Sequence, residues 1–135
     1  MIISVAISFY YSITHKLQII IYYMAFYENT MLAKQDLAEK DLREIISRYN
    51  EIINQTGKVL KVEEWGLLNL ANKIQKYKKA FYIHFKFEGN NETLTEIERK
   101  AKLDNSIIRF LTVKYKKLDL KNEFFDKKIK NNEKK

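Results

Sequence analysis

The side chains of this sequence that are best suited to chemistry are basic and aromatic, and they form no recognisable catalytic set. The chain has no cysteine and only two histidines, His15 and His84, which excludes a thiol nucleophile and a Cys- or His-rich metal site. His84 has neither a nucleophile nor a sequence-local carboxylate partner. Glu63 and Glu64 would face opposite sides of a strand, which argues against paired carboxylates. The sequence therefore predicts a non-enzymatic binding protein without a cofactor.

Clustered cations indicate what such a protein could bind. Lys73, Lys76, Lys78 and Lys79 fall in and beside a predicted turn, where their ammonium groups would release counterions from a phosphate backbone, although lysine-rich turns are often simply solvated. Arg109 is expected to share one side of a predicted strand with the apolar Ile107, Leu111 and Val113, so it needs an anionic or carbonyl partner unless it lies at a sheet end. The net charge of +8 favours an anionic partner, either nucleic acid or a membrane surface.

The hydrophobic periodicity predicts the elements that position these side chains. Strands are expected where apolar residues alternate or cluster with β-branched ones, and helices where they recur every three or four positions. The expected order is a strand at 26–33, a helix between Asp36 and Gly57, strands at 58–74 and 80–88, a helix at 92–103 and a strand at 106–115. Gly66 is expected to kink the long second strand, and residues 75–79 are expected to form the turn that follows it.

The alternation in residues 80–88 predicts a two-sided sheet. One side of this strand is apolar and is assigned to the core, with Phe81, Ile83, Phe85 and Phe87. The other side is assigned to an open face, with Tyr82, His84 and Lys86. In the helix at 92–103 the inward side is expected to hold Leu94, Ile97, Ala101 and Leu103. The β-α-β-β-α-β order predicts an α+β, ferredoxin-like fold with a four-stranded antiparallel sheet and two helices on one face.

The ends of the chain differ from this domain in composition. Residues 1–23 are apolar, but His15 and Lys16 interrupt them and no basic region precedes them, so we interpret them as the product of a start codon assigned too far upstream, with Met24 as the first residue. A membrane anchor or targeting segment is the less favoured reading. Residues 24–115 form the domain. Residues 116–135 carry 8 basic and 4 acidic side chains and are predicted to be a disordered tail.

Four stretches of the domain together resemble one known family. They are Met24 with Tyr27 and Glu28, the run from Val62 to Gly66 continuing to Leu70, Ala71 and Ile74, the run Lys79–Tyr82, and Asp104 with Ile107, Ile108 and Arg109. Over about residues 24–115 the chain resembles the bacterial small-subunit ribosomal protein S6 family. The resemblance implies a cytoplasmic, ribosomal protein that binds the central domain of small-subunit ribosomal RNA and forms a heterodimer with ribosomal protein S18. Leu67, Leu68 and Asn72 depart from the family pattern.

This reading assigns two sets of candidate contacts. The residues expected to bind RNA are Tyr27, Lys73, Lys76, Lys78, Lys79, Arg109 and Lys114. Those expected to contact the protein partner are Trp65, Leu67, Leu68 and Tyr82. The main alternative is a ferredoxin-like regulatory or small-ligand-binding module, which would have little affinity for RNA. A membrane-tethered protein is a third possibility, and it rests only on residues 1–23.

Overall fold

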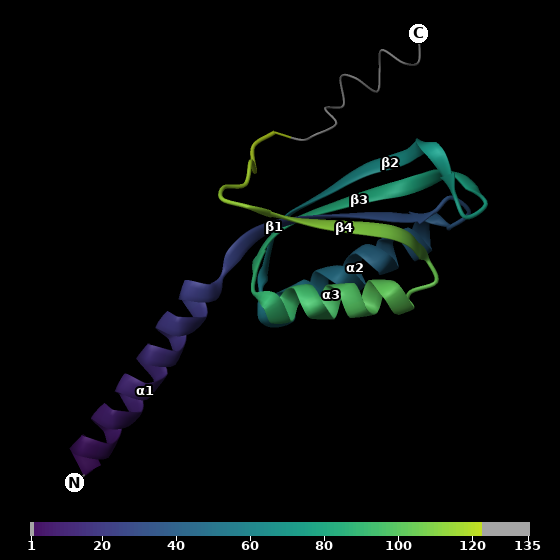
Figure 1. The fold of residues 1–135 in the computed structure, drawn as a ribbon. Coiled ribbons are helices and arrows are strands. Elements are labelled where there is room, and N and C mark those ends of the chain that lie inside the picture. The colour runs from purple at the N-terminus through teal and green to yellow at the C-terminus, as the bar shows by residue number, and fades with distance from the viewer. Residues whose placement is uncertain (1, 123–135) are drawn as a thin grey trace.

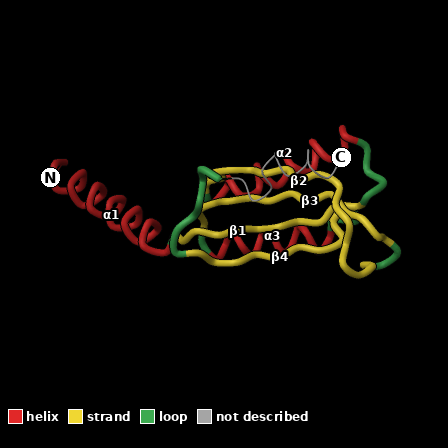
Figure 2. The backbone as a smooth tube through the Cα atoms, turned by 90° about the horizontal axis from the view of Figure 1, so that it is seen from above, coloured by secondary structure: helices red, strands yellow, loops and turns green. Residues whose placement is uncertain are grey.

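The computed structural model describes the backbone of residues 2–122 and the side chains of residues 2–18 and 24–122. Its elements, in chain order, are α1 (Ile2–Tyr23), β1 (Ala25–Lys34), α2 (Glu39–Thr56), β2 (Lys58–Ile74), β3 (Tyr77–Gly89), α3 (Asn91–Leu103) and β4 (Ile107–Tyr115). The strands form one antiparallel sheet in the order β2-β3-β1-β4 (Figure 2). Helices α2 and α3 cover one face of this sheet (Figure 1). The predicted ferredoxin-like fold is confirmed, with α1 as an additional helix before it.

The hydrophobic core lies between the sheet and the two helices. On β3 the side chains of Ile83, Phe85 and Phe87 are fully buried, because alternate residues of a strand point to the same face. They pack against the apolar stripe of α2, whose buried residues are Leu42, Ile45, Tyr49, Ile52 and Ile53. Helix α3 adds Ile97 and Ala101 to this core. The opposite face of the sheet, called the second face below, lies away from both helices (Figure 1).

Two glycines permit local geometries that a larger residue would prevent. Gly57 follows the end of α2, and a Cβ atom there would overlap the carbonyl oxygen of Glu88. The close contact between this helix end and β3 therefore requires glycine. Gly66 has a positive φ of 84° at a register shift between Glu64 and Gly66 in the pairing of β2 with β3. The predicted irregularity of β2 at Gly66 is confirmed.

The turn between β2 and β3 is shorter than the sequence predicts. It consists of Gln75 and Lys76, and the left-handed φ of 55° at Gln75 allows the chain to reverse within these residues. Strand β3 already begins at Tyr77, whose ring is buried. Lys78 and Lys79 therefore belong to a strand, and the prediction that they lie in the turn is wrong.

The inward position predicted for Leu103 is also wrong, because its side chain is 71% exposed. Leu103 is the last residue of α3 and follows the buried Ala101 by two positions. Two steps of an α-helix rotate a side chain by about 200°, which carries Leu103 to the solvent side.

A register shift changes which side chains share a face of β4. Ala33 pairs with Ile107 and Leu32 pairs with Arg109, so one extra residue of β4 is inserted between the two pairs. Ile107 consequently faces the core, whereas Arg109 is exposed with Leu111. The prediction that Arg109 shares a side with Ile107 is wrong, and its guanidinium group needs no buried partner.

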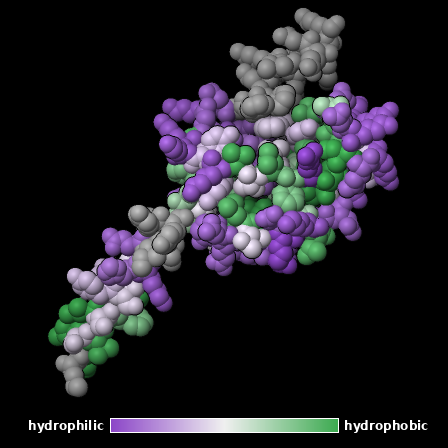
Figure 3. All heavy atoms as spheres, viewed as in Figure 1, coloured by the Kyte–Doolittle hydropathy of each residue, from purple (hydrophilic) through white to green (hydrophobic). Residues whose placement is uncertain are grey.

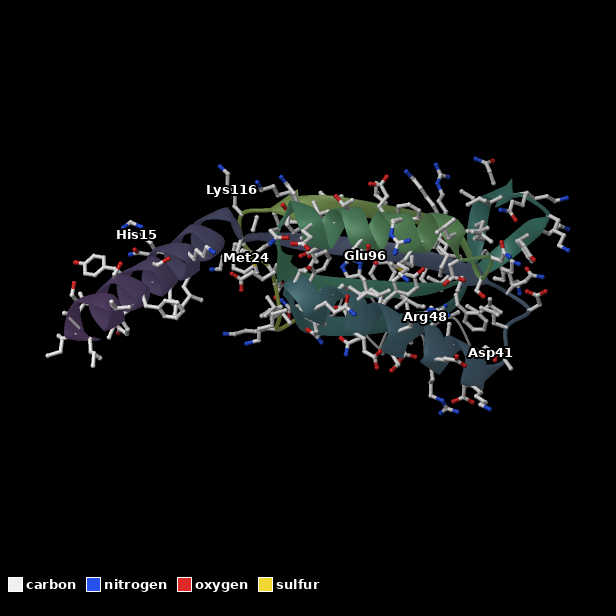
Figure 4. All side chains as sticks on the ribbon, turned by 90° about the horizontal axis from the view of Figure 1, so that it is seen from below. His15, Met24, Asp41, Arg48, Glu96 and Lys116 are labelled. Carbon is white, nitrogen blue, oxygen red and sulfur yellow. The ribbon has the colours of Figure 1, made fainter. Side chains whose placement is uncertain are left out.

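A carboxylate holds the helical layer to the start of β4. Asp104 Oδ2 accepts hydrogen bonds from Arg48 Nη2 at 2.6 Å and from the Tyr49 hydroxyl at 3.1 Å, and its Oδ1 accepts from the Ser106 backbone N–H at 2.9 Å. Burial and the neighbouring Asp104 charge raise the pKa of Tyr49 above its usual range. Tyr49 therefore stays neutral at physiological pH and keeps its role as a hydrogen-bond donor. Figure 4 labels Arg48 on α2.

Helix α1 extends away from the domain, with Met24 at the junction and His15 on its exposed surface (Figure 4). Its exposed large apolar side chains are Ile2, Ile3, Val5, Ile7, Phe9, Tyr10, Tyr11, Ile13 and Leu17. In the described part of the chain, no helix has the length and apolar character needed to cross a membrane. The buried residues of the core cluster all lie between Tyr27 and Ile107, so the side chains of residues 2–18, which are those of α1 that the structure describes, contribute nothing to it.

A chain that begins at Met24 is therefore expected to fold on its own. Its free energy of unfolding, measured by urea denaturation, should lie within about 1 kcal/mol of that of the full chain, because the apolar side chains of α1 that the structure describes bury little surface on the domain. A loss of more than about 2 kcal/mol would contradict this expectation, since it would mean that α1 packs against the domain in solution.

Candidate functional site

The second face carries charged residues that are partly enclosed. Strand pairing brings Glu63 opposite His84, and Lys61 opposite Lys86, across β2 and β3. Glu63, His84 and Lys86 are all buried, with Lys86 only 5% exposed. This face was predicted to be open. The prediction is wrong where Glu63, His84 and Lys86 are buried, and it is right only away from these residues. Buried charges are stable only when they are paired and hydrogen-bonded, so their contacts decide what this face does.

The Glu63 carboxylate is the centre of these contacts. Its Oε1 lies 3.1 Å from Lys86 Nζ and 3.5 Å from Lys61 Nζ. Its Oε2 accepts a hydrogen bond of 3.0 Å from the indole Nε1–H of Trp65. One carboxylate thus joins two cations and an aromatic side chain, and removing either cation would leave a buried negative charge poorly compensated.

Residues 116–122, called the strap below, close this end of the second face. After β4 the strap crosses from β4 toward β2 (Figure 2). The carbonyl oxygen of Asp119 accepts a 2.6 Å hydrogen bond from Lys86 Nζ, and those of Leu120 and Asn122 accept from Lys61 Nζ at 3.2 and 3.4 Å. The strap is the beginning of the predicted tail. Residues 123–135 lie outside the described residues, and disorder of the tail stays a prediction.

The Asp119 side chain shapes the strap from within. Its Oδ1 accepts hydrogen bonds from the backbone N–H groups of Asn122 at 3.2 Å and Lys121 at 3.0 Å. Hydrogen bonds from Asn122 and Lys121 lower the pKa of Asp119, so this carboxyl group is ionised at neutral pH. The turn that presents the Asp119 and Asn122 carbonyl oxygens to the lysines is therefore stabilised locally.

His84 lies between the charged cluster and the rest of the second face. Its Nδ1 is 2.8 Å from the Thr30 hydroxyl, and its Nε2 is 3.4 Å from Glu28 Oε2. Burial lowers the pKa of His84, although Glu28 and Glu63 oppose this effect. A neutral ring fits the contacts if Thr30 donates to Nδ1 and Nε2–H points to Glu28. These contacts, together with the stacking of Trp65 on the ring, favour a structural role for His84. Among residues 2–122 there is no group of acidic or histidine side chains that could hold a metal ion.

The uncovered part of the second face is aromatic and aliphatic. The Trp65 ring stacks on His84 with centroids 4.8 Å apart and on Tyr82 with centroids 6.0 Å apart, at 20° in both cases. Beside Tyr82 lies a shallow pocket lined by Thr30, Leu32, Tyr82, Arg109, Phe110 and Leu111. Leu111 is 65% exposed. A stacked aromatic cluster next to exposed aliphatic groups and one guanidinium has the composition of a protein-binding surface.

The second candidate surface is the basic hairpin, defined by Lys73, Lys76, Lys78 and Lys79. All four side chains are exposed at the end of the sheet where β2 and β3 meet. The Lys79 backbone N–H donates to Gln35 Oε1 at 3.2 Å, which ties the hairpin to the loop after β1. Hydrophilic side chains gather at this end of the molecule in the space-filling view (Figure 3). Closely spaced ammonium groups of this kind suit contacts with phosphates.

Comparison with known proteins connects this arrangement to one family. The sequence profile of the family described as "Ribosomal protein S6" matches residues 26–114. The chain belongs to the ribosomal protein S6 family. Small ribosomal subunit protein bS6 of Pelagibacter ubique is 38% identical over 106 residues, covering 78% of this chain and 88% of that protein. The bS6 protein of Zymomonas mobilis is 40% identical over 92 residues, covering 67% of this chain and 74% of the relative.

A solved structure supports the S6 fold. The crystal structure of 30S ribosomal protein S6 from Thermotoga maritima has a TM-score of 0.65, with 82% of this chain and 95% of that chain covered. The sequence identity is 22%, so this likeness bears on the fold alone.

The predicted RNA contacts of this S6-family chain do not form one cluster. Arg109 and the basic hairpin lie toward the same end of the sheet, whereas Lys114 is exposed toward the opposite end of β4, roughly 23 Å of strand from Ile107. Tyr27 is 6% exposed and stacks on Phe87 in the core, with centroids 5.6 Å apart. Alternation along β1 turns the Tyr27 ring toward the helices, and its role as an RNA contact stays a prediction.

The predicted partner contacts divide between the two faces. Leu68 and Tyr82 lie on the side of the sheet that carries Trp65. Leu67 pairs with Phe81 and points to the other side, so it cannot share one surface with Leu68.

Sequence reasoning missed the contacts that organise the second face of this S6-family protein. Lys61, Glu63 and Trp65 are spaced two residues apart, and this spacing predicts that their side chains lie on the same face of a strand. The sequence gives no comparable signal for Glu28 or Asp119, because they reach the cluster from β1 and from the strap.

Proposed function

We propose that this protein is a structural component of the small ribosomal subunit in the cytoplasm, where it binds small-subunit ribosomal RNA through the basic hairpin and a protein neighbour through the second face. Membership of the ribosomal protein S6 family over residues 26–114 carries the proposal. The relatives named above are small-subunit ribosomal proteins, which supports the same place for this chain. The function requires no cofactor and no catalytic group.

The RNA contact is assigned to the basic hairpin because of its charge and exposure. The four exposed lysines are clustered, and Arg109 is exposed on the neighbouring part of the sheet. Lysines supply affinity that depends on salt but not on sequence, whereas the planar guanidinium of Arg109 can bind a phosphate bidentately and fix orientation. The resemblance to the S6 family suggests the central domain of small-subunit ribosomal RNA as the target.

The protein neighbour is assigned to the uncovered part of the second face. Trp65 and Tyr82 offer large, ordered aromatic surfaces, with Leu68 and Leu111 beside them. Aromatic residues of this kind often dominate interface energies. The family resemblance suggests ribosomal protein S18 as this partner.

Sedimentation of a native cell extract on a sucrose gradient tests the proposal directly. The protein is expected to sediment with small-subunit particles and to move to the slow fractions when high salt removes electrostatically bound proteins, because its RNA contacts are ionic. Its absence from the small-subunit fractions at low salt would contradict the ribosomal role. Salt-dependent binding to purified ribosomal RNA would in addition separate it from the small-ligand-binding alternative.

A further inference from the structure

The strap is connected to Trp65 by a short chain of polar contacts. Its carbonyl oxygens hold the ammonium groups of Lys86 and Lys61, which both lie against Glu63 Oε1. The other oxygen of the same carboxylate holds the indole N–H of Trp65. Trp65 in turn stacks on His84 and Tyr82.

From these contacts we infer that the strap is a positioning element for the protein-binding face: by fixing Lys86 and Lys61 on Glu63, it fixes the orientation of Trp65. One consequence of this inference rests on the proposed function: loss of the strap should weaken binding of the protein neighbour. The orientation of Trp65 is a property of the free protein and is measurable without any partner.

The burial of the cluster explains why a backbone segment at one end of the face affects a side chain near its middle. Glu63 is 4% exposed and Lys86 has the strap over it, so their attraction acts in a medium of low effective dielectric. Without the strap, water would reach both ammonium groups and weaken their hold on the carboxylate. Glu63 would then be free to adopt other rotamers, and the indole N–H would lose a fixed acceptor.

The strap also leaves the surface it orients accessible. It covers Lys86 and Lys61, whereas Tyr82, Arg109 and Leu111 line the shallow pocket farther along the sheet. The strap therefore supports the protein-binding surface from one end and does not occupy it.

Two truncated forms separate the strap from the rest of the tail. A chain ending at Asn122 keeps the strap, and a chain ending at Tyr115 lacks it, while both keep every residue of the core cluster. Trp65 is the single tryptophan, so intrinsic fluorescence reports on it alone. Removal of the strap is expected to change the emission maximum and to increase acrylamide quenching, with an unchanged far-UV circular dichroism spectrum. The form ending at Asn122 should match the full chain.

A substitution in the full chain provides a second test. Asp119→Ala removes the acceptor that holds the turn of the strap, so it should change Trp65 quenching in the same direction as the truncation but less strongly. Thr95→Ala, an exposed change on the outside of α3, is the matched control and should have no effect. Identical Trp65 fluorescence in the forms ending at Asn122 and at Tyr115 would overturn the inference.

Binding to ribosomal protein S18 gives the functional readout. The form ending at Tyr115 is expected to bind about tenfold more weakly than the form ending at Asn122, because a less ordered Trp65 must be fixed again on binding. If Trp65 fluorescence responds to the strap but no form of the chain binds this partner, the positioning role stands and the proposed function fails. Equal, measurable affinities of the two forms would contradict the functional consequence of the strap.

Discussion

Simultaneous replacement of Lys76, Lys78 and Lys79 by alanine is expected to weaken binding to small-subunit ribosomal RNA by roughly 100-fold at about 0.15 M salt. Each lysine that neutralises one phosphate contributes close to one unit to the slope of log affinity against log salt concentration, so the slope should fall in magnitude by about 2 to 3. The affinities of the wild-type and triply substituted proteins should converge near 1 M salt, where counterion release no longer favours binding. A filter-binding or fluorescence titration across a salt series, with the protein neighbour present, measures both quantities.

A charge-matched control separates local contact from overall charge. Replacing the exposed Lys58, Lys100 and Lys102 removes the same number of positive charges from the far end of β2 and from the helical layer. This control should change the slope far less. The hairpin substitutions should alter the free energy of unfolding by no more than about 1 kcal/mol, including the loss of the contact between Lys76 Nζ and the Tyr77 ring. A wild-type slope in the triple variant would mean that the basic hairpin is only solvated.

Trp65→Ala is expected to weaken the complex with the protein neighbour by about 2 kcal/mol or more, which is roughly a thirtyfold increase in Kd. The substitution removes the ring that stacks on Tyr82 and His84 and thereby flattens the uncovered part of the second face. Isothermal titration calorimetry with ribosomal protein S18 measures the change. Thermal unfolding should be recorded beside it, because the substitution also removes the indole hydrogen bond to Glu63.

Two companion variants make this result specific. Trp65→Phe keeps an aromatic ring without the N–H group, so it should retain part of the affinity. Leu103→Ala removes an exposed apolar side chain from the end of α3, on the helical side of the sheet, and should leave Kd unchanged. An unchanged Kd for Trp65→Ala would show that Trp65 is not part of the interface. The protein neighbour would then be expected to bind the other exposed part of this face, around Arg109 and Leu111.

The order and type of the elements from β1 to β4 could be predicted from the sequence, because an element that is buried on one side repeats its apolar residues at a regular local spacing. The helical conformation of α1 was not predicted. The stripe from Leu42 to Ile53 gave a helix, and the alternation from Phe81 to Phe87 gave a strand with one face in the core. Gly66 marked a real irregularity because its positive φ suits glycine. The resemblance to the S6 family was likewise visible in the sequence and is confirmed by the family match.

Which side chains meet could be seen only in the folded protein, because local periodicity holds no information on how distant strands pair. One inserted residue in β4 turned Arg109 away from Ile107 and out to the surface, and a two-residue turn at Gln75 placed Lys78 and Lys79 on a strand. Strand register and the return of the chain at Asp119, 33 residues after Lys86, built the buried cluster around Glu63. Glu63 and Lys86 are buried charges, and they are tolerated because they pair with each other across two strands and because the strap supplies a further acceptor for Lys86. A single strand read alone reveals neither of these partners.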